Sequence, residues 1–262
     1  MARWLASSVP EWVAAVGFLV LLPTVMVLVQ IRVHRRFSRL RNGESNDVAG
    51  IMLSAAVVAY SIAVGLCVIT LWGKVDDAQR TTEAEATNLL ALAGGSGVFG
   101  TAVQEQIRAG VIAYNTDVVD HWSARIHGEA SDAVRQDLGG LVTTVGALRP
   151  ETEAQRAFVD NAVVRLGRAA ELRAASVDRA QEQQLPGVLW IAVLGGSMIV
   201  LALSLTCGVR DSALRGILLA GLTVTVGINL FLVVELNYPF YGDIAIGPDS
   251  YRDVITTLTQ MR

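Results

Sequence analysis

Apolar residues gather in four long runs without a charged side chain, two before and two after an extended polar middle. The runs contain 20, 26, 27 and 19 residues and lie between Glu11 and Arg32, Asp47 and Lys74, Glu182 and Arg210, and Arg215 and Glu235. At ~1.5 Å per residue, each run can cross ~30 Å of hydrocarbon as a helix. Buried helices of soluble domains instead carry charge on their wet face. The pattern predicts an all-α membrane protein with four transmembrane helices in a 2+2 layout.

Composition supports this prediction, since 52% of the residues are apolar, 17% are charged and the mean hydropathy is +0.46. The net charge of −3 is too small to imply a nucleic-acid partner. The first run has full span length and is followed by arginines instead of a small-residue cleavage site, so we expect a retained helix. Cys67 and Cys207 lie toward opposite membrane sides in the predicted topology, and a disulfide between them is not expected.

Arginines indicate the orientation. The link between the first two spans carries Arg32, Arg35, Arg36, Arg39 and Arg41. The link between the last two spans adds Arg210 and Arg215, and with four spans both links share one side. An excess of arginine in short links marks the cytoplasmic side. The middle region and both termini are then extracytoplasmic, as expected for a multi-pass protein of a bacterial plasma (inner) membrane.

The middle region has 11 basic and 16 acidic residues between Lys74 and Glu182, a net charge of −5, and it reads as helical. One apolar stripe predicts a helix of roughly 28 residues. Its members are Val103, Ile107, Val111, Tyr114, Val118, Trp122 and Ile126. A second stripe follows Pro150 and comprises Ala154, Phe158, Ala162, Leu166 and Ala169. We expect the second span to continue past Lys74 as a helix, a Gly-rich turn to follow, and a helix to re-enter the membrane at Leu185-Pro186.

These segments suggest four parts of the chain. Residues 1–73 form the first transmembrane pair with its Arg-rich loop, and 74–184 form a helical extramembrane domain. Residues 185–236 form the second transmembrane pair, and 237–262 form a C-terminal Pro-Phe segment and tail.

Catalytic and cofactor motifs are weak. Gly95, Gly97 and Gly100 have the G-x-G-x-x-G spacing, but a helical stretch precedes them, so a helix-to-helix turn is the better interpretation. His121 and His127 lie six residues apart, which does not place two metal ligands on one helix face. Asp117, Asp120 and His121 are explained by a solvated helix face. We therefore expect no catalytic residues, no metal site, no cofactor and no enzymatic activity.

Small and polar residues inside the spans are more informative. The second run contains Gly50, Ser54, Tyr60, Ser61 and Gly65, and the last contains Gly216, Ala220, Thr223 and Gly227. Small residues four apart let helices approach closely in lipid, so helix packing within one subunit is the simpler interpretation and a pore-lining stripe the alternative. Pro23 can kink the first span.

Glu235 ends the fourth span and opens the segment ELNYPFYGDIAIGPD. An acidic residue next to the bilayer can be a simple boundary charge. The functional alternative is a cation-attracting mouth or a substrate carboxylate, because ionisable groups at membrane depth are costly and tend to mark pathways. The candidate ion-pathway or pore-mouth residues are Glu235, Pro239, Phe240, Gly242 and Asp243.

Three short segments in the same order resemble a bestrophin-like family of bacterial membrane proteins of uncharacterised function. They are YNTDVVDHW from Tyr114 to Trp122, LPGVLW from Leu185 to Trp190, and YPFYG from Tyr238 to Gly242. Together with the span layout, the resemblance covers most of the chain from the second span onward. No reaction is carried over from it.

The chain is more distantly similar to bestrophin anion channels, which are pentamers of four-span subunits with a Pro-Phe-Gly-acidic segment after the last span. Here Tyr241 precedes Gly242, and the acidic run that holds calcium in bestrophins is reduced to Asp243 and Asp249. This difference argues against calcium regulation. Bestrophins also keep their middle helical region in the cytoplasm, whereas the arginines of this chain place it outside.

The resemblance favours an oligomeric ion channel or channel-like pore whose partners are the lipid bilayer, an inorganic ion and further copies of the chain, with a pentamer implied by likeness. Ser54, Tyr60, Ser61 and Gly65 are its candidate span-packing or pore-lining residues. The alternative is an extracytoplasmic sensor or scaffold without transport activity.

Overall fold

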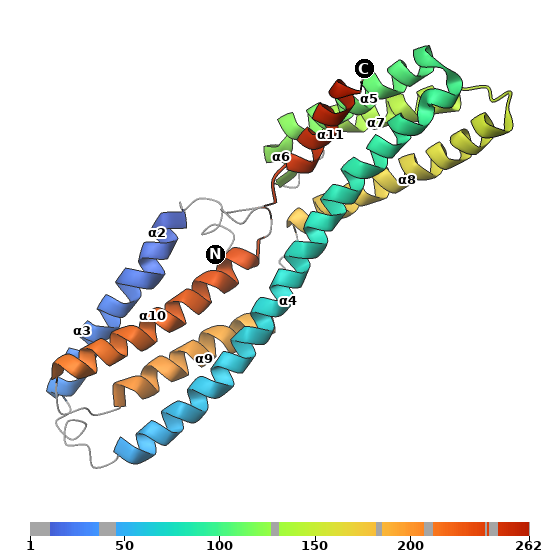
Figure 1. Cartoon of the computed structure of the whole chain (residues 1–262). Coiled ribbons are helices and arrows are strands. Elements are labelled where there is room, and N and C mark those ends of the chain that lie inside the picture. The colour runs from blue at the N-terminus through green and yellow to red at the C-terminus, as the bar shows by residue number, and fades with distance from the viewer. Residues whose placement is uncertain are drawn as a thin grey trace. The chain divides into compact units, whose positions relative to one another are not determined.

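The computed structural model describes residues 11–36, 46–126, 131–181, 185–206, 212–238, 240 and 246–261. The regular elements of these residues are all helices, and no strand occurs among them (Figure 1). The chain divides into two compact units. The membrane unit comprises Met1–Lys74 and Gln183–Ile244, and the helical unit comprises Val75–Glu182 and Ala245–Arg262.

Four helical segments are long and apolar enough to cross a bilayer, one for each predicted run. They are Gly17–Arg36, Val48–Phe99, Gly187–Thr206 and Ala213–Leu236. Large apolar side chains on these segments stay exposed, among them Ile62, Ile191 and Ile217. Lipid is the environment that such faces need. The protein is therefore a multi-pass membrane protein.

The first span changes its helical form just before Pro23. It consists of α2 (Glu11–Val16), a π-helical turn η1 (Gly17–Leu21) and α3 (Leu22–Arg36). The N–H of Leu22 donates to the carbonyl of Gly17, five residues back. Because Pro23 has no N–H, a regular α-helix would lose a hydrogen bond at this point in any case. The structure thus has a π turn directly upstream of Pro23, the residue at which the sequence suggested a kink.

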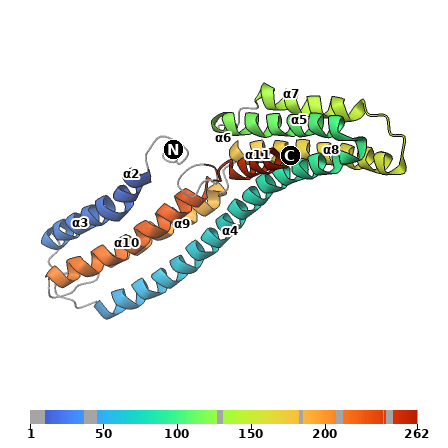
Figure 2. The ribbon, with the colours of Figure 1, turned by 45° about the horizontal axis from the view of Figure 1, so that its top comes forward.

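Helix α10 (Ser212–Leu236) lies beside the first span, as Figures 1 and 2 both show, and it contacts α3 and η1. A Cβ atom added at Gly227 would collide with the backbone carbonyl of Phe18. Next to this contact the rings of Phe18 and Phe231 have centroids 6.4 Å apart. The predicted close approach at a small residue is confirmed at Gly227, whereas Gly216 has no such neighbour within 4 Å.

Helices α4 (Asn46–Gly95) and α9 (Gly187–Thr206) also meet at a glycine. A Cβ atom at Gly196 would lie 2.9 Å from the ring of Tyr60. The hydroxyl groups of Tyr60 and Ser197 are hydrogen-bonded to each other at 3.0 Å. Tyr60 is only 6% exposed, so its phenol group belongs to the packing between spans.

In the helical unit, α4 continues without a break to Gly95, as predicted. A short 3-10 helix (Ser96–Phe99) then leads to Gly100, whose φ of +87° strains any residue with a side chain. Helix α5 (Thr101–Asp120) starts directly after it. The glycine-rich segment is therefore a turn between two helices, which confirms that interpretation.

In the described part of the helical unit, five helices follow the turn. They are α5, α6 (Trp122–Ile126), α7 (Asp132–Gly146), α8 (Glu153–Gln181) and α11 (Asp249–Gln260). The predicted helix of roughly 28 residues is wrong in one respect, because the chain breaks at His121 between α5 and α6. Its stripe is nevertheless buried at Ile107, Val111, Tyr114, Val118 and Trp122. The second stripe lies on α8 and is buried at Ala162, Leu166 and Ala169, whereas Ala154 is exposed.

The C-terminal segment contributes a helix to the helical unit that the sequence did not predict. Helix α11 contacts α5. Tyr251 is fully buried, and its ring centroid lies 6.0 Å from that of Trp122. Residues 245–262 thus complete the core of a unit whose other elements lie far upstream in the sequence.

We predict that Gly227→Ala lowers the free energy of unfolding by about 1–3 kcal/mol, because the new methyl group meets backbone that cannot rotate away. Thermal unfolding of the full chain in detergent measures the loss. The matched control is Gly221→Ala, at a position with no atom within 4 Å of the added carbon. Equal melting temperatures for the two variants would contradict a tight contact between α10 and η1.

Candidate functional site

The end of α10 is closed by backbone hydrogen bonds from Asn237 and Tyr238. Asn237 follows the last helical residue and is 0% exposed. Its N–H donates to the carbonyl of Val234, and the N–H of Tyr238 donates to that of Glu235, both at 3.3 Å. These bonds satisfy carbonyl groups that a helix end otherwise leaves open.

Asn237 also connects two distant segments of the membrane unit. Its Oδ1 accepts a hydrogen bond of 2.8 Å from the N–H of Leu185. Leu185 is buried and directly precedes Pro186, whose carbonyl accepts the first N–H bonds of α9. The side chain of Asn237 therefore joins the start of the third span to the end of the fourth.

Two of the five proposed pore-mouth residues belong to the described part of the chain. Glu235 is half-buried in the last turn of α10, and Phe240 is 4% exposed. Pro239, Gly242 and Asp243 lie outside the described residues. The other acidic residue of the segment, Asp249, belongs to the helical unit, where it forms an ion pair of 3.0 Å with Arg252.

The four candidate residues of the second span point in two directions. Tyr60 faces α9, as described above, whereas Ser54 and Ser61 are exposed. Gly65 is exposed as well, and a Cβ atom there would have no neighbour within 4 Å. Within one chain, Tyr60 is a packing residue and the other three form part of an uncovered face of α4.

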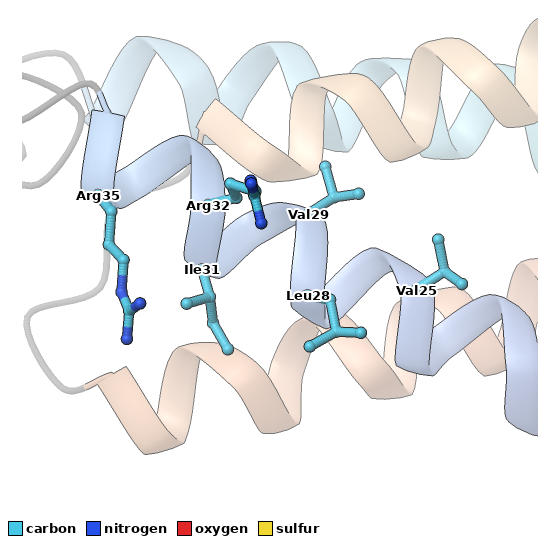
Figure 3. A pocket seen from close by; sticks show the side chains of 6 residues that line it. All are labelled: Val25, Leu28, Val29, Ile31, Arg32 and Arg35. Carbon is cyan, nitrogen blue, oxygen red and sulfur yellow. The ribbon is translucent and has the colours of Figure 1, made fainter.

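The arginines used to predict orientation lie at the end of α3. Arg32, Arg35 and Arg36 are exposed, and Arg39 and Arg41 lie outside the described residues. Arg32 and Arg35 line a groove of ≈620 Å³ along the exposed side of α3 (Figure 3). Its other lining residues are Val25, Leu28, Val29 and Ile31. An apolar helix face that ends in arginines suits the boundary between hydrocarbon and lipid headgroups.

In the helical unit, the segment YNTDVVDHW supplies core side chains. The hydroxyl of Tyr114 donates to Glu85 Oε1 at 2.5 Å, and both residues are 0% exposed. Asn115, which is also buried, donates through Nδ2 to the carbonyl of Val111 at 2.7 Å. The motif therefore fixes α5 against α4 inside the unit.

Two carboxyl groups lie close together on α5 and α7. Burial and the neighbouring carboxylate of Asp117 raise the pKa of Asp137 above its ordinary value. Asp120 and His121 on the same part of the chain are exposed. Among the residues that the structure describes, no group of three or more His, Cys, Asp or Glu side chains is placed to hold a metal ion.

Comparison with known proteins identifies the family. A bestrophin-like domain model matches residues 20–251, which include most of the first span, the other three spans and nearly all of the helical unit. The chain belongs to the bestrophin-like family. No curated protein and no solved structure matches the chain. The resemblance inferred from three short segments is thereby confirmed for this bestrophin-like protein.

The structure gives those family segments a physical relation. Asn237, the residue directly before the third segment, accepts a hydrogen bond from Leu185 of the second segment in the membrane unit. Trp122 of the first segment packs on Tyr251 of α11 in the helical unit. Asn237 was not among the predicted site residues. What could have indicated its role in the sequence is an amide side chain close to the end of a 19-residue uncharged run, where an unpaired polar group costs free energy.

We predict that Asn237→Leu lowers the free energy of unfolding by about 1–3 kcal/mol, because it leaves the buried N–H of Leu185 without its acceptor. Denaturation of the purified full chain, followed by tryptophan fluorescence, measures this change. Asn161→Leu at an exposed position of α8 is the control and should stay within about 0.5 kcal/mol of the parent. A parent-like Asn237→Leu variant would show that the joint is dispensable.

The carboxyl pair predicts a pH effect of defined sign. Since the folded-state pKa of Asp137 is raised, its contribution to stability is present at low pH and is lost as the pH rises above the unfolded value of 3.8 toward the folded pKa. Asp137→Asn should therefore unfold at a higher temperature than the parent at pH 7, and the two should converge below pH 3.8. The gain should not exceed about 1 kcal/mol at this half-exposed site. A pH-independent difference would contradict this assignment.

Proposed function

We propose that this bestrophin-like protein assembles with further copies of itself into an ion channel or channel-like pore, with α4 facing the central path. The observation that carries this proposal is the uncovered small-residue face of α4. Gly50 and Gly65 have no neighbour within 4 Å of an added Cβ atom, and Ser54 and Ser61 are exposed between them. Large apolar residues would be expected on a face that meets only lipid.

The geometry of an α-helix supports a single surface. At about 100° per residue, Gly50, Ser54, Ser61 and Gly65 fall within an arc of roughly 60°. The Ser54 hydroxyl donates to the carbonyl of Gly50 at 2.9 Å, so it keeps an oxygen available toward the outside. Ile62, Leu66 and Ile69 occupy the adjacent part of the helix and are exposed. One edge of α4 thus suits water or a neighbouring helix, and the adjacent edge suits lipid.

We further propose the orientation that the arginines favour. The basic ends of the first and fourth spans are cytoplasmic, and the helical unit and both termini are extracytoplasmic, in a bacterial inner membrane. In this arrangement the Asn237 joint and Glu235 lie toward the extracytoplasmic end of the fourth span. Glu235, Pro239, Phe240, Gly242 and Asp243 would then form or support the outer mouth of the path.

The test uses cysteine accessibility in reconstituted protein. In a background with Cys67→Ala and Cys207→Ala, Ser61→Cys should give a current in planar bilayers that a charged methanethiosulfonate reagent blocks at least about tenfold. A charged adduct in a narrow path both fills it and changes its electrostatic field. The matched control is Ala59→Cys, an exposed small residue about 160° away on the same helix turn, where the same reagent should leave the current unchanged.

Two results would overturn the pore. One is the absence of current under varied ions, voltages and pH. The other is equal block of the current in the Ser61→Cys and Ala59→Cys variants, which would show that the small-residue face does not line the ion path. A Ser61→Cys variant that forms intersubunit disulfides without any current would instead support an oligomer in which this face is a packing surface.

A sensor or scaffold is the second candidate function. It is favoured by Val163 and Val164, which are 60% and 70% exposed on α8 of the helical unit. Neighbouring apolar side chains in a water-facing unit suit a partner surface. Deleting residues 98–180 should abolish capture of such a partner while the spans still insert, and unchanged capture would remove this candidate.

A further inference from the structure

A small cavity lies inside the membrane unit, and each of the four spans contributes to its wall. Its volume is ≈150 Å³. Leu53 comes from α4, Ser204 from α9 and Gln30 from α3, and α10 supplies Arg215, Leu218, Leu219 and Leu222. The wall is thus mainly leucine, with one amide, one hydroxyl and one guanidinium group.

The amide in this wall is buried without a hydrogen-bond partner. Gln30 is 3% exposed, and its Nε2 reaches no acceptor among the described residues. The backbone carbonyl of Gln30 is occupied, because the ring Nδ1 of His34 donates to it at 3.1 Å. An amide N–H group in hydrocarbon surroundings costs about 1–3 kcal/mol when it is unpaired. A ligand with acceptor oxygens would remove this cost.

The cavity lies near one end of the spans. Ser204 is two residues from the end of α9, and Arg215 is three residues from the start of α10. Gln30 is six residues from the end of α3, so the polar groups lie roughly 3–9 Å inside the helix ends. This depth and the charge of Arg215 correspond to the level of lipid phosphate groups.

We propose that this cavity binds the phosphate and glycerol portion of an anionic phospholipid. Gln30 Nε2 donates to a phosphate oxygen, the Arg215 guanidinium provides the opposite charge, and the leucines surround the glycerol carbons and the beginning of an acyl chain. At about 10–15 Å³ of accessible volume for each water-sized atom, the cavity holds on the order of ten non-hydrogen atoms, which is the size of a glycerol phosphate group. The leucine wall favours a lipid over free phosphate, which would leave most of its oxygens facing apolar carbon.

Such a lipid would connect all four spans of one subunit at their basic end. The proposal is independent of ion conduction, since a structural lipid serves a sensor as well as a pore.

The experiment measures lipid retention by the purified full chain. Protein reconstituted with phosphatidylglycerol or with phosphatidylcholine is extracted, and bound lipid is counted by native mass spectrometry. Phosphatidylglycerol should be retained at least about tenfold more strongly than phosphatidylcholine. Arg215→Gln should lower this retention about tenfold, and Gln30→Leu about fivefold, consistent with loss of hydrogen bonds to a charged group. The matched control is Arg35→Gln, which removes the same charge from the exposed side of α3 and should change retention less than twofold.

A third variant distinguishes loss of lipid binding from loss of folding. Leu222→Phe fills the cavity while Gln30 and Arg215 remain, so it should reduce retention and leave the melting temperature at or above that of the parent. Equal losses for Arg35→Gln and Arg215→Gln would show general surface attraction and overturn the site. Saturable binding of inorganic phosphate that depends on Gln30 would replace the lipid by a soluble anion. Parent-like retention in all three cavity variants would show that the cavity takes no lipid.

Discussion

Inside a bilayer, no water is available to hydrogen-bond a polar group, and this constraint governs the membrane unit at every level. Backbone groups meet it by forming helices, which is why four uncharged runs become four helices. Polar side chains must meet it one by one. Tyr60 does so with Ser197 across α4 and α9, and Asn237 does so with the N–H of Leu185. Among the described residues, such specific hydrogen bonds between side chains and distant segments act together with close helix packing at Gly227 and Gly196.

The helical unit, in contrast, buries its apolar side chains in a core of its own. Its largest buried side chains come from segments far apart in the sequence, including Tyr114 of α5 and Tyr251 of α11. Buried Glu85 accepts a hydrogen bond from Tyr114, which places a polar contact among the buried apolar side chains. Such a contact fixes one helix register, because a shifted helix would leave the carboxyl group without its donor. The family segment around Tyr114 is thus explained by packing.

The sequence was sufficient for the spans, the continuation of α4 and the family, because uncharged length and short motifs are local properties. It was insufficient for features that depend on contacts between distant segments. The break at His121 interrupts an apolar stripe whose helical period continues through it. Helix α11 lies in the C-terminal segment 237–262, for which no helix was predicted. The role of Asn237 depends on Leu185, 52 residues upstream, and therefore has no local pattern in the sequence. The second span shows the same limit, because Tyr60 and Ser61 belong to one set of candidate residues although they lie about 100° apart on the helix and only Tyr60 faces a neighbouring span.

The π turn at Gly17–Leu21 has a consequence for how this span can change in evolution. A π turn takes up one residue more than the α-helical turn that it replaces, so α2 and α3 keep the faces that one regular helix would give them. Loss of one residue between positions 17 and 21 would restore a continuous α-helix without turning the segment Glu11–Val16 about the helix axis. The span could thereby be shortened by one residue in one genetic step, while the contact of α3 with α10 stayed in place.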